Sequence, residues 1–70
     1  MYKKFRLQII RREDDSVEET QFARSILEIE ELVDKYFYTN GELNLRNIKY
    51  YYQIARLNGN GEYVIYRGEV

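Results

Sequence analysis

Apolar and polar positions alternate along the first segment of the chain, residues 2–12. Phe5, Leu7 and Ile9 fall at every second position, and most of the residues between them are polar or charged. A period of two is typical of a strand that buries one face. The sequence therefore predicts a half-buried strand over residues 2–12.

Acidic and hydroxyl residues follow this strand over residues 13–16, where Asp and Ser side chains can bond to their own backbone. We interpret this segment as a turn, after which residues 17–24 fold back as a second strand. The alternative is a helix that already begins at Ser16, because Glu18 and Glu19 follow it closely.

A two-residue turn sets the register of this first hairpin. It pairs Leu7 with Phe22, so that apolar side chains meet, and it pairs Arg11 with Glu18, so that opposite charges meet. We therefore expect Phe22 to face the core together with Leu7.

A capping-box pattern starts at Ser25, which is followed three residues later by Glu28 and then by an apolar run. This pattern predicts a helix that begins at Ser25. One face of this helix carries the apolar residues Ile29, Leu32, Val33, Tyr36 and Phe37. We expect it to end near Tyr38, before a C-cap and turn at Asn40 and Gly41.

Aromatic and β-branched residues lie on both sides of a segment rich in Gly and Asn, residues 58–61. This pattern predicts a hairpin between strands at residues 48–57 and 62–67. We interpret residues 42–47 as a connecting loop. The alternative is a helix over residues 44–58, because apolar residues there also match helical spacing.

These elements give the order ββαββ within a single small domain of residues 1–70. The predicted fold class is α+β, with a four-stranded, largely antiparallel sheet and one helix packed on one face. The helix would cover the apolar side chains of the first hairpin, namely Phe5, Leu7, Ile9 and Phe22.

Eight tyrosines are the unusual feature of the composition, and three of them are consecutive at residues 50–52. Both faces of the second hairpin carry aromatic or aliphatic groups, but one helix covers only one face. A three-residue loop would place Tyr63 beside Tyr51, whereas a two-residue loop would place Tyr66 there. Some tyrosines have a purely structural interpretation, as core or cross-strand partners with hydroxyls in water.

The functional interpretation is that the uncovered face binds a partner, because Tyr is enriched at interfaces and exposed apolar patches mark contacts. The partner is a protein, and self-association into a homodimer would also relieve the small core. The candidate contact residues are Tyr51, Gln53, Leu57, Tyr63 and Arg67, with Lys4, Arg6 and Arg12 nearby.

Catalytic and metal-binding chemistry has little support in this chain, which contains no Cys and no His. The common nucleophile–base pairs and the usual zinc ligands are therefore missing. Ser16 and Ser25 are explained as turn and cap residues, and the Gly spacing matches no phosphate-binding loop. We expect no enzymatic activity, no cofactor, no metal site and no small-molecule substrate.

Eleven basic and twelve acidic residues give a net charge of −1. A dedicated nucleic-acid binder of this size is usually strongly basic, because phosphate contacts supply most non-specific affinity. Basic residues interleaved with tyrosines on the uncovered face nevertheless keep single-stranded nucleic-acid binding as the alternative function. A third possibility is a stable small domain without further specific activity.

The absence of Cys fits a reducing compartment, and we expect a cytoplasmic location without a signal peptide or membrane contact. No family motif is matched. In size and style, with one helix over hairpins, the chain resembles small proteins of phage and prophage genomes. That resemblance implies a stoichiometric regulator of another protein, in line with the interaction module inferred from the tyrosine-rich face.

Overall fold

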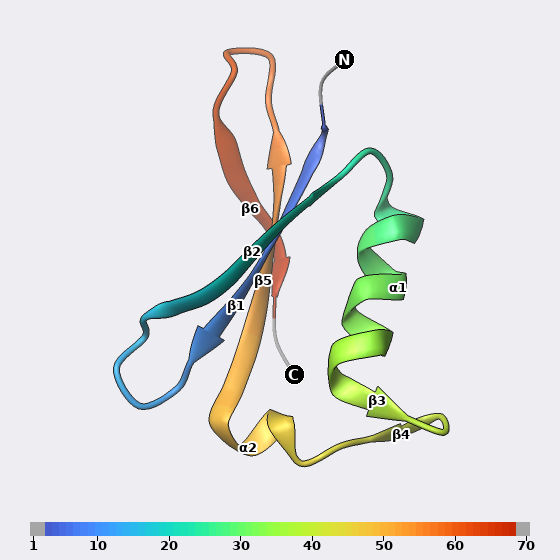
Figure 1. Ribbon diagram of the computed structural model, residues 1–70. Helices are drawn as coiled ribbons and strands as arrows, with labels where there is room; N and C mark the ends of the chain where they lie inside the picture. Colours follow the sequence, from blue (N-terminus) through green and yellow to red (C-terminus); the bar gives the residue numbers. More distant parts are fainter. Residues whose placement is uncertain (1–2, 69–70) are drawn as a thin grey trace.

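The computed structural model describes residues 3–68, which form one layer of strands and a helix packed against it (Figure 1). Along this described part the elements are β1 (Phe5–Arg11), β2 (Val17–Ala23), α1 (Ile26–Phe37), β3 (Tyr38–Thr39), β4 (Glu42–Leu43), α2 (Arg46–Lys49), β5 (Tyr50–Leu57) and β6 (Tyr63–Gly68). The predicted α+β class and the order of the main elements are confirmed.

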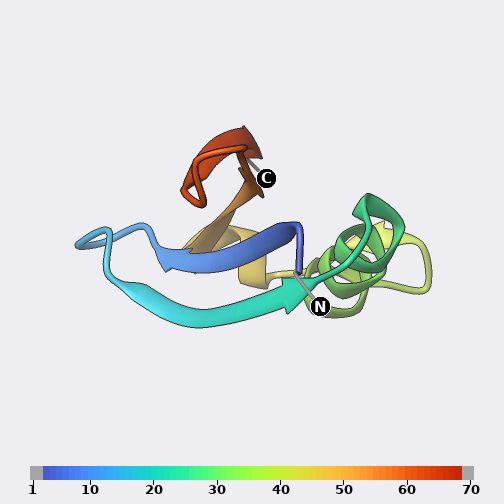
Figure 2. The ribbon, with the colours of Figure 1, turned by 90° about the horizontal axis from the view of Figure 1, so that it is seen from above.

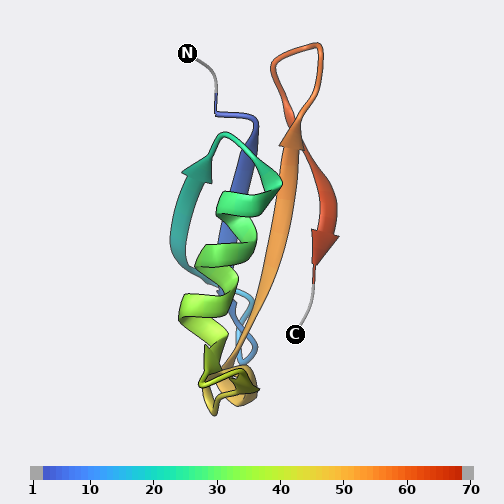
Figure 3. The same ribbon diagram turned by 90° about the vertical axis from the view of Figure 1, so that its right-hand side faces the viewer.

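The main sheet has the strand order β2-β1-β5-β6, and every neighbouring pair is antiparallel. The first strand of the chain is therefore central, while β2 and β6 form the two edges. Helix α1 lies over β1, between β2 and β5, and leaves β6 clear of it (Figure 3). Seen from above, the β5–β6 hairpin rises away from β1 and β2 (Figure 2).

The first hairpin forms as predicted, but its register is different. The Arg11 N–H donates to the Ser16 carbonyl at 2.9 Å, so the loop between them has four residues and not two. Asp15 adopts a left-handed conformation with φ 57° that this longer loop requires. A register shift between Ile9 and Ile10 then leaves Glu18 as an extra residue on β2.

This register moves Phe22 to the other face of the sheet. Leu7 pairs with Gln21, and Phe22 pairs with Arg6, because a one-residue shift turns every side chain of a strand over. The prediction that α1 covers Phe22 is therefore wrong. Ala23, opposite Phe5, is the buried β2 residue beneath the helix and is 2% exposed.

The capping box predicted the helix start correctly. The Ser25 hydroxyl accepts from the Glu28 N–H at 3.3 Å, and the Glu28 carboxylate accepts from the Arg24 N–H at 3.3 Å. The helix buries Ile29, Val33 and Phe37 on one stripe. It ends near Tyr38, as predicted, but the C-cap is the extended Tyr38 itself, so the expected C-cap at Asn40 and Gly41 is wrong.

Residues 42–47, predicted as a connecting loop, contain β4 and the first part of α2. Asn40 and Gly41 have φ values of 53° and 83°, which fits the two-residue turn that joins β3 to β4. The Asn44 side chain then accepts from the Arg46 N–H at 2.9 Å at the start of the short helix α2. Strand β5 consequently begins at Tyr50, two residues later than predicted.

The predicted second hairpin is present and has the three-residue loop. Asn58 donates its N–H to the Glu62 carbonyl at 2.8 Å, and its side chain accepts from the N–H groups of Asn60 and Glu62. Gly61 supplies the positive φ of 80° that this loop needs. Leu57 therefore pairs with Tyr63.

The core lies between α1 and the sheet. Its buried members are Leu7, Ile9, Ala23, Ile29, Val33, Phe37 and Ile54. Tyr50 and Tyr52 pack against it from the helix side, which confirms the structural interpretation for part of the tyrosine run. Ile10 and Ala55 are also buried, at 4% and 1% exposure, although both lie on the other face of the sheet.

Candidate interaction surface

The face of the main sheet that points away from α1, called the far face below, carries most of the residues predicted for partner contact. Alternation along β5 and its pairing with β1 and β6 place them there together: Tyr51, Gln53, Leu57 and Tyr63, with Lys4, Arg6 and Arg12. The second hairpin contributes the first four, and the β1 strand with its flanks contributes the basic three.

A cluster of three side chains joins the two hairpins on the far face. The Arg6 guanidinium lies 5.1 Å from the centre of the Tyr63 ring, and the Phe22 and Tyr63 rings lie 5.7 Å apart. The Tyr63 hydroxyl donates to the Lys3 carbonyl at 2.7 Å. Phe22 lies on this face because it pairs with Arg6 in the observed register of β2. The register expected from the sequence places it in the core instead.

Arg6 contributes an unsatisfied polar atom to this cluster. Its Nε is buried and has no hydrogen-bond partner among residues 3–68. The stacking of its guanidinium on Tyr63 offsets part of the resulting cost. The far face is therefore a layer of packed side chains, and its members Ile10 and Ala55 are buried within it.

Tyr51 stands at the opposite end of the far face. Its hydroxyl donates to the Asp15 carboxylate at 2.9 Å, and the Arg12 guanidinium lies 5.5 Å from its ring centre. The hydrogen bond to Asp15 raises the pKa of the Tyr51 phenol above its ordinary value. The ring therefore connects β5 to the β1–β2 turn, and one side of it is occupied by an arginine.

The remaining predicted contact residues differ in their surroundings. Gln53 pairs with Gln8 in the middle of the sheet, and the Leu57 N–H donates to the Lys4 carbonyl at 2.7 Å. A register shift between Ile54 and Ala55 pairs the backbone of Arg67 with Ile54. The Arg67 side chain lies outside the described part of the structure.

Strand β6 carries exposed apolar residues that sequence reasoning did not nominate. Val64, Ile65 and Tyr66 are consecutive and are 50%, 58% and 52% exposed. Tyr66 still packs edge-on against Phe5, with the ring centres 5.9 Å apart. The sequence does contain a signal for this surface, namely the uncharged run Tyr-Val-Ile-Tyr in the last predicted strand. Such a run marks a contact surface only if its strand lies at an edge of the sheet.

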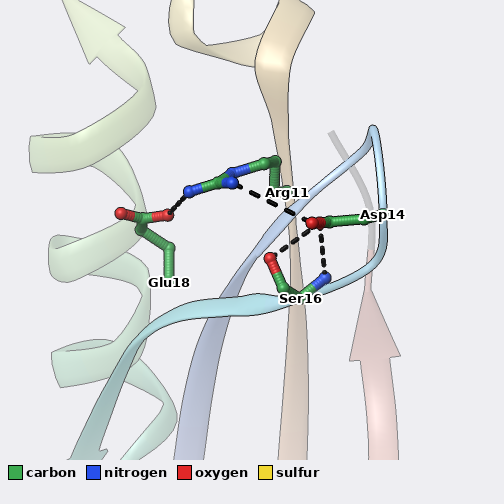
Figure 4. Close-up of polar contacts among 4 residues, drawn as sticks. All are labelled: Arg11, Asp14, Ser16 and Glu18. Carbon is green, nitrogen blue, oxygen red and sulfur yellow. Dashed lines mark hydrogen bonds and ion pairs between the residues drawn. The ribbon is translucent and has the colours of Figure 1, made fainter.

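The acidic residues of the first turn are engaged in local contacts (Figure 4). Arg11 binds Glu18 at 2.8 Å and lies 3.9 Å from Asp14. The Asp14 carboxylate accepts from the Ser16 hydroxyl at 2.7 Å and from the Ser16 N–H at 3.0 Å. These hydrogen bonds hold the pKa of Asp14 below its ordinary value. The network explains the turn as a structural element.

A hollow lies at the foot of the sheet, where the β1–β2 turn meets α2. It has a volume of about 540 Å³ and is lined by Arg11, Arg12, Glu13, Ile48, Lys49 and Tyr50. Arg12 donates from Nε to the Asn47 carbonyl at 2.9 Å, and Arg11 is paired with Glu18. The arginines that line this hollow thus serve to join the turn to its neighbours.

Within residues 3–68 no helix is long and apolar enough to span a membrane. The same part of the chain gathers no cluster of three or more acidic side chains that could hold a metal ion.

Comparison with known proteins adds no assignment. No protein-family model, no curated protein and no solved structure matches the chain. The candidate function therefore depends on the geometry of the surfaces described above.

Proposed function

We propose that this protein is a non-enzymatic interaction module that binds a partner protein through β6 and the adjoining far face. One observation carries the proposal. Three consecutive apolar side chains on an edge strand, Val64 to Tyr66, are each at least half exposed. Val64 lies on the helix side and Ile65 on the far face, so this edge is apolar on both sides, and exposed apolar surface marks contact sites.

The surroundings of β6 support this proposal. Phe22, which is 45% exposed, packs against Tyr63 of β6 on the far face, so the apolar surface continues beyond β6 itself. Aromatic residues are enriched at interfaces, whereas charged residues are depleted at interface cores. The run from Tyr63 to Tyr66 contains no charge. Such a surface fits a partner that offers apolar groups and backbone hydrogen bonds.

The same geometry gives weaker support to single-stranded nucleic acid as the ligand. Base stacking needs accessible ring faces. Here one face of Tyr63 is covered by Arg6, and one face of Tyr51 is covered by Arg12. We accordingly rank protein binding first. A cytoplasmic site of action, as a stoichiometric regulator, belongs to the same proposal and rests on the cysteine-free composition.

Site-specific photo-cross-linking in the cells that produce the protein tests the proposal. A photoreactive phenylalanine analogue replaces Ile65 in one variant and Leu27 in the other. Leu27 is the matched control because it is apolar and 69% exposed, but it lies on the outer side of α1. We expect a cross-linked protein band from position 65 and none from position 27.

The same experiment separates the alternatives. Equal cross-linking from both positions, or none from position 65, would contradict the proposal. Nuclease treatment of the cross-linked material distinguishes the ligand class, because a nucleic-acid adduct disappears whereas a protein adduct keeps its mobility. Binding of a labelled oligonucleotide that weakens steeply with salt would favour the alternative function.

A further inference from the structure

The backbone groups at the free edge of β6 can be assigned from the hydrogen-bond alternation of the second hairpin. Asn58 and Glu62 form a hydrogen-bonded pair at 2.8 Å. Antiparallel ladders alternate between hydrogen-bonded and non-hydrogen-bonded pairs, so Val64 bonds back to Arg56 on β5. Tyr63 and Ile65 therefore direct their N–H and C=O groups outward. The Leu57 N–H, which donates to Lys4 on the other side, agrees with this assignment.

From this edge we infer that β6 pairs antiparallel with β6 of a second copy, so that two sheets join into one. The inference rests on the proposed interaction function and names its partner. A twofold axis through Val64 sets Tyr63 of each copy opposite Ile65 of the other. Four backbone hydrogen bonds then form, because both residues of each such pair face outward.

Side chains in this arrangement are complementary on both faces. Tyr63 and Ile65 lie on the far face, where an aromatic and a β-branched residue form a favourable cross-strand pair. Val64 lies on the helix side and meets Val64 of the other copy. Helix α1 leaves β6 clear, so it does not obstruct the second sheet (Figure 3).

Charge favours a second copy at this edge and at no other edge of the sheet. Identical edges place like residues near one another, which costs energy when those residues are charged. The run from Tyr63 to Tyr66 contains no charge, whereas β2 carries Glu18 and Glu19 within its seven residues. A β6–β6 pair also closes after two copies, because it leaves only the two β2 edges outside.

Charge-swap variants at Val64 test the inference, with native mass spectrometry and analytical ultracentrifugation of the purified chain as measurements. The wild type is expected to show twice the monomer mass. Val64→Lys and Val64→Glu alone should each weaken dimerisation by at least about tenfold, because identical charges then lie directly opposite. An equimolar mixture of the two variants should restore a heterodimer. Leu27→Lys is the matched control and should leave the dimer unchanged.

Hydrogen exchange of the wild-type protein gives a second test, which does not depend on whether the Val64 variants fold. Dilution below the dimerisation range should deprotect the amides of Tyr63 and Ile65, while the amide of Val64, bonded to β5, stays protected. A monomer at all concentrations overturns the inference, as does a dimer that survives both single Val64 variants. Neither result overturns the proposed function, which fails if position 65 cross-links to no protein or if positions 65 and 27 cross-link equally.

Discussion

The two outer strands of the sheet, β2 and β6, are equivalent in position but opposite in character. Both are antiparallel edges with one neighbour. In β2 every residue from Val17 to Phe22 is exposed, and its sequence is mainly acidic and polar. In β6 the described side chains are aromatic and β-branched, and Val64, Ile65 and Tyr66 are at least as exposed as Val17 and Phe22 of β2.

This difference shows that only one of the two open edges is protected against pairing with another chain. An open edge invites pairing with another chain, and charged residues are a common means of preventing it. The glutamates of β2 provide that protection, and the Arg11–Glu18 pair additionally ties the strand to β1. No charge occurs between Tyr63 and Tyr66. We interpret β6 as the edge retained for contact.

The largest expected effect is a difference in stability between a buried and an exposed isoleucine of the second hairpin. Ile54 on β5 is fully buried, whereas Ile65 on β6 is 58% exposed. Ile54→Ala should lower the free energy of unfolding by about 2–5 kcal/mol, because it opens a cavity beneath α1. Ile65→Ala should lower it by less than about 0.5 kcal/mol under conditions where the chain is monomeric.

Urea denaturation followed by circular dichroism measures both variants. If Ile65→Ala were as destabilising as Ile54→Ala in dilute solution, β6 would be part of the structural core. The contrast between a protective edge and a contact edge would then fail.

A smaller effect tests the contact that joins the two edge strands across the far face. Phe22 and Tyr63 lie 5.7 Å apart at an interplanar angle of 54°. A double-mutant cycle with Phe22→Ala and Tyr63→Ala should give a coupling energy of about 0.5–1.5 kcal/mol, the range for aromatic pairs. A cycle that pairs Phe22→Ala with Tyr66→Ala is the matched control and should be close to additive. Additivity in both cycles would show that the Phe22–Tyr63 contact does not couple the two edge strands.

The smallest effect is a pH dependence confined to the first turn. Hydrogen bonds from Ser16 lower the pKa of Asp14 from its ordinary value of 3.8, so the folded state favours the carboxylate. The resulting stabilisation is fully present above the unfolded pKa and is lost as the pH falls through the folded pKa. We expect nuclear magnetic resonance shifts of residues 12–16 to change below about pH 4.

Asp14→Ala is the control for this titration and should remove the local change at Ser16. The loop at residues 58–62 contains one acid, Glu62, and should keep its structure over the same range. Loss of the second hairpin at the same pH would show that protonation of Asp14 acts on the whole sheet and not on the first turn alone.

Local chemistry determined the elements of this protein. The capping box at Ser25 sets the helix start, because one side chain satisfies a backbone donor of the first turn. The period of two in β1 and the Asn58–Gly61 loop each act over a few residues, so sequence reasoning recovered both hairpins and the α+β class. The short helix α2 was missed because its signal is a single side chain, Asn44.

Only the tertiary structure decided the faces and the edges. The extra residue Glu18 in β2 moved Phe22 from the core to the far face, because a shift of one residue turns every later side chain of a strand over, whereas the longer turn alone would have shifted the pairing by two. The order β2-β1-β5-β6 made β6 an edge, and no local pattern contains that information. The uncharged Tyr-Val-Ile-Tyr run is visible in the sequence, but it is exposed along a free edge only because the sheet order leaves β6 with a single neighbouring strand.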